Sequence, residues 1–479
     1  MINYNLVIDQ STSGTKVLLV SDMIIDRVDK KHEQIYPKIG WVEHDALEII
    51  DNIKYLIDLI LERNNLLPSQ IDAISITNQR ETIVSWNKAT GVPFYNALVW
   101  QCNRAQSICD ELQNNGQEKI VREKTGLNID TYFSGPKLKW LSQNCENYRK
   151  ALETSNVCIG TIDSWVIWNL TNGIEFKTDM SNASRTMLFN INDLKWDDEL
   201  LAMFDVKLES LPKIEGSDSK FGSYMGIPII GVIADSQASL IANDCDEVGH
   251  AKITLGTGSS IMLNSKYEKD GIHPTLVHTI ACKKEDKVTY AIEGVIRSMG
   301  DTLQWAKNEL CLIDRVDMDL QGSFEANGVI FIPAQLGMGT PYWTTKSKAS
   351  INGLTRNSSR TEIIRSIYAS LIFQIKDVID EINNYSNSKV LVLKVDGGLS
   401  KNEFLMKSLS DLLQITIYVS DTEELSAIGA LKLARRKLNI NYLEYKPSKN
   451  KKLLRQYDEW KQYVVTHLKM EENYVKRKN

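Results

Sequence analysis

The sequence lacks the markers of several large classes of protein. None of its apolar runs reaches the roughly 18–20 residues that a membrane-spanning helix needs. The seven cysteines are odd in number and form no CxxC pair, and the six histidines form no HExxH motif. This pattern argues against a disulfide framework and a zinc site, and it is typical of free thiols in a reducing compartment.

Signals for secretion, for nucleic-acid binding and for the commonest ATP sites are also missing. The first nine residues have neither a basic start nor a long apolar stretch, so we expect a cytoplasmic protein. The net charge of −5 disfavours nucleic acid or an anionic membrane as the main partner. Neither the GxxxxGK(S/T) motif nor the HRD and DFG motifs of protein kinases occur. If this protein uses ATP, it is neither a P-loop enzyme nor a protein kinase.

What is present is an alternation of predicted strands and helices, which indicates an α/β fold. Helices are predicted over Asp45–Arg63, which begins with a capping residue, and over Thr361–Ile382. Ile71–Thr77 and Lys389–Val395 are typical of buried strands. Because single cores rarely exceed about 250–300 residues, a chain of 479 residues predicts two domains.

One segment near the start is echoed in the middle of the chain. Asn5–Val20 reads NLVIDQSTSGTKVLLV, and Lys252–Asn264 reads KITLGTGSSIMLN. Each is a strand, a turn of Gly, Ser and Thr, and a second strand. The repeat predicts duplicated halves, with domains over residues 1–245 and 246–479, the second ending in a helical tail. Two unrelated hairpins would give the same pattern.

The two glycine-containing turns are suited to binding phosphate. Gly14, Gly256 and Gly258 allow close approach of backbone N–H groups, and Lys16 can add a positive charge. A third glycine cluster at Gly397–Gly398 follows a predicted buried strand and can accept an adenosine. Each turn alone is a weak signal, because such turns commonly do no more than connect strands.

Two aspartates stand where strands end. Asp235 follows the apolar strand Ile227–Ile233 and opens a helix-like segment, so it can accept a proton from a hydroxyl group. Asp9 ends the first strand and can hold Mg²⁺ directly or through water. As isolated residues, both fit equally the ordinary role of a helix cap.

Four further residues can contact a small polyol. Arg80 and Glu81 follow a strand, where adjacent opposite charges can donate to and accept from neighbouring hydroxyl groups. Trp100 and Tyr132 can pack against a carbon skeleton. Taken alone, the first two also fit a surface ion pair, and the two aromatic residues fit ordinary core packing.

These residues stand in a recognisable order. From Tyr4 to about Leu433 the chain resembles the FGGY carbohydrate kinases, and among them the glycerol kinases most closely. The matching stretches include IYPKIGWVEHD, ITNQRET, YNALVWQCNR, IDTYFSGPKLKW, TDMSNASRTMLFNI, LGTGSSIML, GTPYW and VDGGLSKNEFLM. The combination of ITNQRET with SNASRTMLFN is far more specific than a single glycine motif.

The resemblance implies an actin-like ATPase (ribonuclease H-like) fold, with two duplicated domains around a central cleft. It implies transfer of phosphate from ATP to glycerol, giving sn-glycerol 3-phosphate, with Asp235 as the general base and Mg²⁺ at Asp9. The positions that match glycerol contacts in the family are Arg80, Glu81, Tyr132, Asp235 and Trp100. Those that match ATP contacts are Thr12, Ser13, Gly14, Lys16, Thr257, Gly300, Gln304, Gly398 and Asn402.

The sequence departs from the glycerol kinase pattern in ways that leave the acceptor open. Ser236 stands where those kinases usually have Gln, and Ser260 stands where they usually have an aromatic residue. The first turn reads DQSTSGTK in place of DQGTTSSR. A larger and more polar pocket is expected, so a kinase of another small polyol or sugar, for example erythritol, stays an alternative. A non-catalytic ATP-binding protein is a third reading, and the homodimer and homotetramer both stay open.

Overall fold

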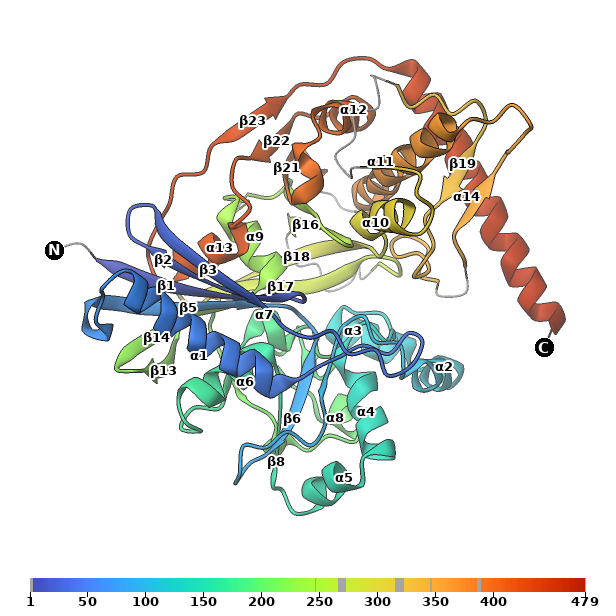
Figure 1. The fold of residues 1–479 in the computed structure, drawn as a ribbon. Helices are drawn as coiled ribbons and strands as arrows, with labels where there is room; N and C mark the ends of the chain where they lie inside the picture. Colours follow the sequence, from blue (N-terminus) through green and yellow to red (C-terminus); the bar gives the residue numbers. More distant parts are fainter. Residues whose placement is uncertain are drawn as a thin grey trace.

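The computed structural model describes residues 3–245, 247–265, 273–314, 323–344, 347–385 and 389–478. Two large mixed sheets form its two parts, and helices α9 (Asp235–Ala242) and α13 (Leu425–Leu433) lie between them (Figure 1). Among the described helices, none combines the length and the apolar composition needed to span a membrane. The α/β architecture predicted from the sequence is confirmed.

The first large sheet comes from the first half of the chain. β1 is antiparallel to β2, β2 is antiparallel to β3, and β5 and β14 are added in parallel on the other side of β1. In spatial order its strands are β13 (Lys220–Tyr224), β14 (Ile227–Ala234), β5 (Ile71–Asn78), β1 (Tyr4–Gln10), β2 (Gly14–Val20) and β3 (Ile24–Lys31).

The second large sheet repeats this plan. β15 and β16 form the hairpin, β18 pairs antiparallel with β16, and β21 and β22 are added in parallel to β15. Its strands in spatial order are β17 (Val277–Lys284), β18 (Lys287–Ile296), β16 (Ser259–Ser265), β15 (His250–Leu255), β21 (Val392–Asp396), β22 (Ile417–Ser420) and β23 (Tyr442–Tyr445). The five shared strands have the same order and directions in both sheets, so the sequence echo belongs to a duplicated architecture.

A smaller layer lies below the first sheet in Figure 1 and carries its own apolar core. Its small sheet contains β4 (Glu43–His44), β7 (Ala97–Leu98), β6 (Ile83–Asn87) and β8 (Val157–Thr161). Its main helices are α2 (Gln106–Asn114), α3 (Glu118–Thr125), α4 (Ser134–Asn144) and α5 (Glu146–Glu153), with α7 (Met180–Ala183) and α8 (Asp198–Met203) beside them. α1 (Ala46–Arg63) and α6 (Ile162–Leu170) share the core of the first sheet.

The second sheet is covered by α10 (Gly300–Asn308), α11 (Arg360–Tyr385), α12 (Glu403–Leu413) and α14 (Lys451–Lys478). Apolar side chains of α11 and α14 share one core with the sheet, and α14 then extends beyond the body of the molecule (Figure 1). The remaining described pieces are short: β9 (Lys177–Asp179), β10 (Phe189–Asn190), β11 (Lys195–Trp196), β12 (Lys213–Glu215), β19 (Ile330–Ile332), β20 (Ser350–Asn352) and the single turns Pro68–Gln70, Leu208–Ser210 and Gly398–Lys401.

The predicted elements are present with small shifts at their ends. Asp45 caps α1 by accepting hydrogen bonds from the backbone N–H groups of Leu47 and Glu48, as the sequence predicted. α11 extends a few residues past its predicted end. The strand predicted from Lys389 begins at Val392, because the N–H of Val390 donates to the side chain of Asn383 before pairing starts.

The division of the chain at residue 245 stays a prediction. α13 comes from the second half of the sequence, yet it packs against α9, β5 and β14 of the first half. The two halves therefore share an apolar layer, in which Ala427 and Leu431 belong to the same buried cluster as Val7 and Ile233. This layer brings the ends of β1, β14 and β15 close enough to form a site together.

Candidate active site

Two cavities meet at the turn between β15 and β16. The first cavity has a volume of about 270 Å³ and is lined from both halves of the chain by Thr12, Arg80, Glu81, Trp100, Gln101, Tyr132, Asp235, Ser236, Thr254, Gly256–Ser260 and Val295–Arg297. The second cavity, of about 540 Å³, is lined by Leu255–Thr257, Gly300, Asp301, Gln304, Gly398, Leu399 and Asn402. Gly256 and Thr257 line both, so a molecule in one cavity can reach a molecule in the other.

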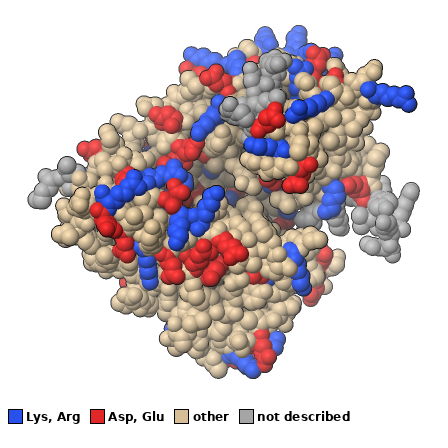
Figure 2. All heavy atoms as spheres, viewed as in Figure 1, with Lys and Arg blue, Asp and Glu red and all other residues tan. Residues whose placement is uncertain are grey.

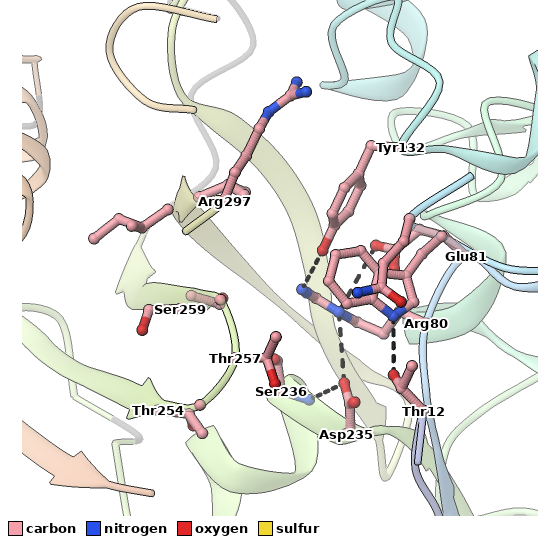
Figure 3. Close-up of a pocket in the computed structure, with 17 residues that line it drawn as sticks. Thr12, Arg80, Glu81, Tyr132, Asp235, Ser236, Thr254, Thr257, Ser259 and Arg297 are labelled. Carbon is pink, nitrogen blue, oxygen red and sulfur yellow. Dashed lines mark hydrogen bonds and ion pairs between the residues drawn. The ribbon is translucent and has the colours of Figure 1, made fainter. Parts of the chain in front are cut away.

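All five residues predicted to contact the acceptor line the first cavity. Tyr132 and Asp235 enter it from opposite directions and meet at the guanidinium of Arg80 (Figure 3). Arg80 Nε lies 3.5 Å from Asp235 Oδ1, and Arg80 Nη2 donates to the Tyr132 hydroxyl over 3.4 Å. Trp100 packs against the Tyr132 ring, with 5.4 Å between the ring centres. The guanidinium of Arg80 thus holds the Asp235 carboxylate and the Tyr132 hydroxyl together on one side of the first cavity.

Arg80 is itself held by a buried network of charges. Its Nη2 donates to Glu293 Oε1 over 2.7 Å, and Arg185 Nη1 lies 2.6 Å from the other oxygen of Glu293. Arg185 Nε donates to Glu81 Oε1 over 2.6 Å. The two arginines and two glutamates are almost completely inaccessible to solvent. Two positive and two negative charges are paired, so the network carries no net charge.

The sequence reasoning missed Arg185 and Glu293. Arg185 lies within the stretch SNASRT, and Glu293 interrupts the otherwise apolar strand YAIEGVI. A charged residue in the middle of a buried strand is the signal that could have identified Glu293, because such a residue needs a partner. The sequence alone does not say which cation supplies it.

Glu81 points into this network from an uncommon backbone conformation. Its φ of +60° lies in the left-handed region, which costs a residue with a side chain on the order of 1–3 kcal/mol. The ion pair with Arg185 and the packing around it hold Glu81 there. The conformation turns its carboxylate toward the first cavity, next to Arg80.

Asp235 occupies the junction of β14 and α9, as predicted. Its carboxylate accepts a hydrogen bond from the Ser236 N–H at 2.6 Å, and its side chain is 35% exposed within the cavity. Burial raises the pKa of Asp235, while the nearby cations Arg80 and Lys252 lower it. A raised pKa makes the carboxylate a better proton acceptor near neutral pH than an ordinary aspartate.

Asp9 lies close to the same junction but belongs to β1. The pKa of Asp9 is raised to about 6, chiefly by burial; Lys16 opposes the rise, and the carboxylates of Glu424 and Asp235 contribute to it. Because the carboxylate of Asp235 contributes to the raised pKa of Asp9, the two groups fit a site where a cation can lie between them. In the described part of the chain no group of three or more His, Cys, Asp and Glu could hold a metal, so a metal here would rely on substrate oxygens as well.

Lys16 differs from the expected free phosphate ligand. Its Nζ lies 3.1 Å from Glu424 and 3.8 Å from Asp9, and Arg27 donates to the second oxygen of Glu424 over 2.7 Å. Lys16 lines neither of the two cavities. Its charge is partly neutralised by Glu424, which lies at the start of α13. Its predicted contact with ATP therefore requires a shift of the side chain.

Five of the nine residues predicted to contact ATP line the second cavity: Thr257, Gly300, Gln304, Gly398 and Asn402. Close backbone approach requires glycine at positions 300 and 14 but not at Gly398, where a Cβ would meet no atom within 4 Å. A Cβ on Gly300 would lie 2.6 Å from the Gly256 carbonyl oxygen, and one on Gly14 would lie 2.7 Å from that of Lys30. Asn402 also caps α12 through its side-chain oxygen.

The turn between β1 and β2 lies beside the first cavity. Thr12 lines the first cavity, where its hydroxyl accepts a hydrogen bond from Trp100 Nε1 at 2.9 Å. Ser13 is exposed, and Gly14 begins β2. The structure therefore brings Thr12 next to the residues predicted to bind the acceptor and leaves Ser13 at the surface of the turn.

Ser260 takes part in the charge network. Its hydroxyl donates to Glu293 Oε1, the same oxygen that binds Arg80, over 2.5 Å. The sequence comparison predicted that Ser260 enlarges the pocket and makes it more polar. In the structure the Ser260 hydroxyl binds Glu293, which in turn binds Arg80. The side chain therefore stabilises the charge network, and its hydroxyl is already paired within the protein.

The buried network generates a stability prediction. Replacing Arg185 by Met leaves Glu81 with only its 3.7 Å ion pair to Arg80 and removes the cation beside Glu293 Oε2. Breaking a buried pair by removing one partner costs about 3–5 kcal/mol. We expect urea unfolding of Arg185→Met to show a loss of that size. Arg63→Met is the matched control, because Arg63 pairs with Asp26 at the surface with 57% of its side chain exposed and should cost at most about 1 kcal/mol. Equal losses in both variants would contradict the role of the network.

Comparison with known proteins connects this geometry to a family. The N-terminal domain of the FGGY family of carbohydrate kinases matches residues 4–242, and its C-terminal domain matches residues 251–438. Glycerol kinase 1 of Thermotoga maritima is 40% identical over 440 residues, covering 89% of both chains. The glycerol kinase of Thermoanaerobacter pseudethanolicus is 42% identical over 445 residues, covering 91% of this chain and 90% of its own.

Solved structures agree with the fold. The structure of Plasmodium falciparum glycerol kinase with ADP has a TM-score of 0.86 and 32% identity, with 98% of each chain covered. A ligand-bound xylulose kinase from Lactobacillus acidophilus, at 22% identity, has the same TM-score of 0.86 and supports the fold alone. The predicted actin-like ATPase fold is confirmed. Since the family pattern matches both halves and the relatives align over nearly the whole length, the chain belongs to the FGGY family of carbohydrate kinases.

Proposed function

We propose that this protein transfers the terminal phosphoryl group of ATP to a primary hydroxyl of glycerol, forming sn-glycerol 3-phosphate and ADP. The observation that carries the proposal is the shared turn: Gly256 and Thr257 line both cavities. A triphosphate whose adenosine lies in the second cavity can extend along this turn toward the first. Glycerol kinases at about 40% identity over about 90% of the chain support glycerol as the acceptor.

In this proposal the first cavity binds glycerol through its polar wall. Arg80 and Tyr132 donate hydrogen bonds to hydroxyl oxygens, and Glu81 accepts one. Trp100 lies against the Tyr132 ring and forms the apolar side of the same wall. Because Arg80 is fixed by Glu293 and Asp235, the donors are oriented before the substrate arrives, which lowers the entropy lost on binding.

Asp235 acts as the general base. The attacking hydroxyl oxygen forms a bond to the γ-phosphorus, and its proton passes to the Asp235 carboxylate. The bond from the γ-phosphorus to the bridging oxygen breaks at the same time, and ADP leaves. The backbone N–H of Ser236 keeps the carboxylate oriented. Backbone groups of the turn from Gly256 to Gly258 are placed to donate to the transferring phosphoryl oxygens.

The residues present fit a Mg²⁺ ion carried by the nucleotide. Asp9, with its raised pKa and its proximity to Asp235, would hold the ion directly or through water. An ion held there would supply positive charge that offsets the charge of the phosphates. Asp9 holds its carboxylate in β1 next to Lys16, so the chain itself provides one fixed anion and one cation beside the phosphate path.

A longer polyol such as erythritol is a second candidate acceptor. The observation that favours it is the wall around Ser236 and Ser260, which is built from small residues where an amide and an aromatic ring would fill more of the first cavity.

Cytoplasmic location and assembly as a homodimer or homotetramer belong to the same proposal.

The acceptor is tested by measuring ADP release with glycerol, dihydroxyacetone, erythritol, ribitol and xylulose at saturating ATP. We expect glycerol to give the highest kcat/KM. A missing contact around the carbon chain is worth about 1–3 kcal/mol, or roughly 10–200-fold in specificity. Compared with glycerol kinases that carry Gln and an aromatic residue at positions 236 and 260, we therefore expect a higher KM for glycerol and a smaller change in kcat. A kcat/KM for erythritol at least ten times that for glycerol would show that glycerol is not the preferred acceptor, while phosphoryl transfer to a polyol would still hold.

The role of Asp235 is tested by Asp235→Asn, which preserves shape but cannot accept a proton. Loss of a general base typically lowers the rate by about 10²–10⁴-fold, and ATP binding should be retained in calorimetry. The matched control is Asp72→Asn in β5, whose carboxylate pairs with Arg436 away from both cavities. Wild-type kcat in Asp235→Asn would rule out this assignment.

The pH dependence follows from the charges around Asp235. The base acts only when deprotonated, so kcat/KM falls as pH is lowered through its raised pKa. Lys252 lowers that pKa, and Lys252→Gln should therefore move the acid limb of the profile to higher pH. Lys283→Gln, which removes a lysine paired with Asp286, serves as the control and should leave the limb in place. A shift to lower pH in Lys252→Gln would contradict the assignment.

A further inference from the structure

A salt bridge joins the two halves of the chain at the edge of the first cavity. Arg297, directly after β18, donates through Nη2 to Asp130 Oδ2 over 2.6 Å. Asp130 precedes α4 in the first half. The two side chains are 12% and 13% exposed, so the pair is largely shielded from solvent. Figure 3 shows Arg297 directed away from Asp235 and toward the part of the chain that carries Tyr132.

The second oxygen of Asp130 reaches the acceptor wall. Asp130 Oδ1 accepts a hydrogen bond from the backbone N–H of Tyr132 at 2.8 Å. One carboxylate thus connects Arg297 in the second half to the backbone of a residue that lines the first cavity and contacts Arg80.

Arg297 is also connected to the second cavity. Its guanidinium lies over the ring of Trp343, 5.5 Å from the centre, and both residues belong to the second half. The segment that follows Arg297 runs into the shared turn. Met299 N–H donates to the Thr257 carbonyl over 3.0 Å, and Gly300 N–H donates to the Gly256 carbonyl over 2.9 Å. Gly300 then lines the second cavity.

We propose that Asp130 and Arg297 are positioning residues for the phosphoryl transfer. The ion pair holds Tyr132 in the position that binds the acceptor. It also connects Tyr132 to residues 297–300, which lead to the nucleotide cavity, so that binding of each substrate strengthens binding of the other. This inference rests on the proposed function, because it assigns the acceptor to the first cavity and the nucleotide to the second. Arg297 lines the first cavity and Asp130 does not, and neither is among the residues predicted to contact the acceptor or the nucleotide.

Two single variants separate the ion pair from its surroundings. Asp130→Asn retains an oxygen that can accept the Tyr132 N–H but loses the charge that attracts Arg297. Arg297→Gln removes the cation and leaves Asp130 in place. The matched control is Arg436→Gln, because Arg436 also bridges the halves, through Asp72 at 3.1 Å, but lines neither cavity. Arg297→Lys is the conservative variant, since it retains the charge.

We expect Asp130→Asn and Arg297→Gln each to raise KM for the acceptor about tenfold, with kcat within about twofold of the wild type. Arg297→Lys should recover part of the loss. The double variant should be no worse than either single variant, because each change removes the same interaction. The factor by which a non-hydrolysable ATP analogue tightens acceptor binding in calorimetry should fall toward one in both single variants. Arg436→Gln should leave KM and that factor unchanged.

The inference is overturned if KM and the coupling factor stay within about twofold of the wild type in both single variants. It is also overturned if the double variant shows the product of the single effects, since the residues would then act separately. A purely structural role would lower the unfolding midpoint and leave the coupling factor intact. The ratios are measured with whichever polyol the wild type phosphorylates best. Failure of the glycerol assignment is therefore seen in the wild type, and failure of the pair is seen only in the variants.

Discussion

The paired charges of Arg80, Glu81, Arg185 and Glu293 hold the acceptor wall together. Removing charged groups from water is costly, and attraction between them offsets that cost only when each group has a partner at close range. Here every member is paired, from strands and loops far apart in sequence: β5 ends before Arg80, α7 precedes Arg185, and Glu293 lies in β18. The network therefore requires both halves of the chain to be folded and in contact. It is also what presents Arg80 to Asp235 and Tyr132.

The duplicated sheets explain why the site is bipartite. In each half a hairpin turn emerges next to the end of the parallel strands, and the layer of α9 and α13 sets the two turns against each other. The turn of the first hairpin contributes Thr12 and the turn of the second contributes Gly256 and Thr257 to one cavity. Backbone N–H groups at such turns suit phosphate, whereas the side chains that follow β5 and β14 suit hydroxyl groups. In the proposed function, the fold separates recognition of the phosphate donor from recognition of the acceptor, and the two meet at the turn of Gly256 and Thr257.

Carboxylates and cations lie close together where the two cavities meet. Burial raises the pKa of both Asp9 and Asp235. Lys16 opposes the rise at Asp9, and Arg80 and Lys252 oppose it at Asp235. Glu424 holds Lys16 and Arg27 at the start of α13. Lys16 is thus shared between two protein carboxylates.

The sequence by itself determined the α/β class, the repeated hairpin, the capped helix after Asp45 and the placement of Asp235 at a strand end. These features depend on local periodicity, turn chemistry and motif order, which can be read along the chain. Only the tertiary structure decided that Arg185 and Glu293 anchor the site, that Lys16 binds Glu424, that Thr12 faces the acceptor side and that Asp130 meets Arg297. In each of these cases the partner lies more than 80 residues away or on the other half of the molecule. The free energy of a charge depends on that partner and on its burial, and neither is encoded in the residues beside it.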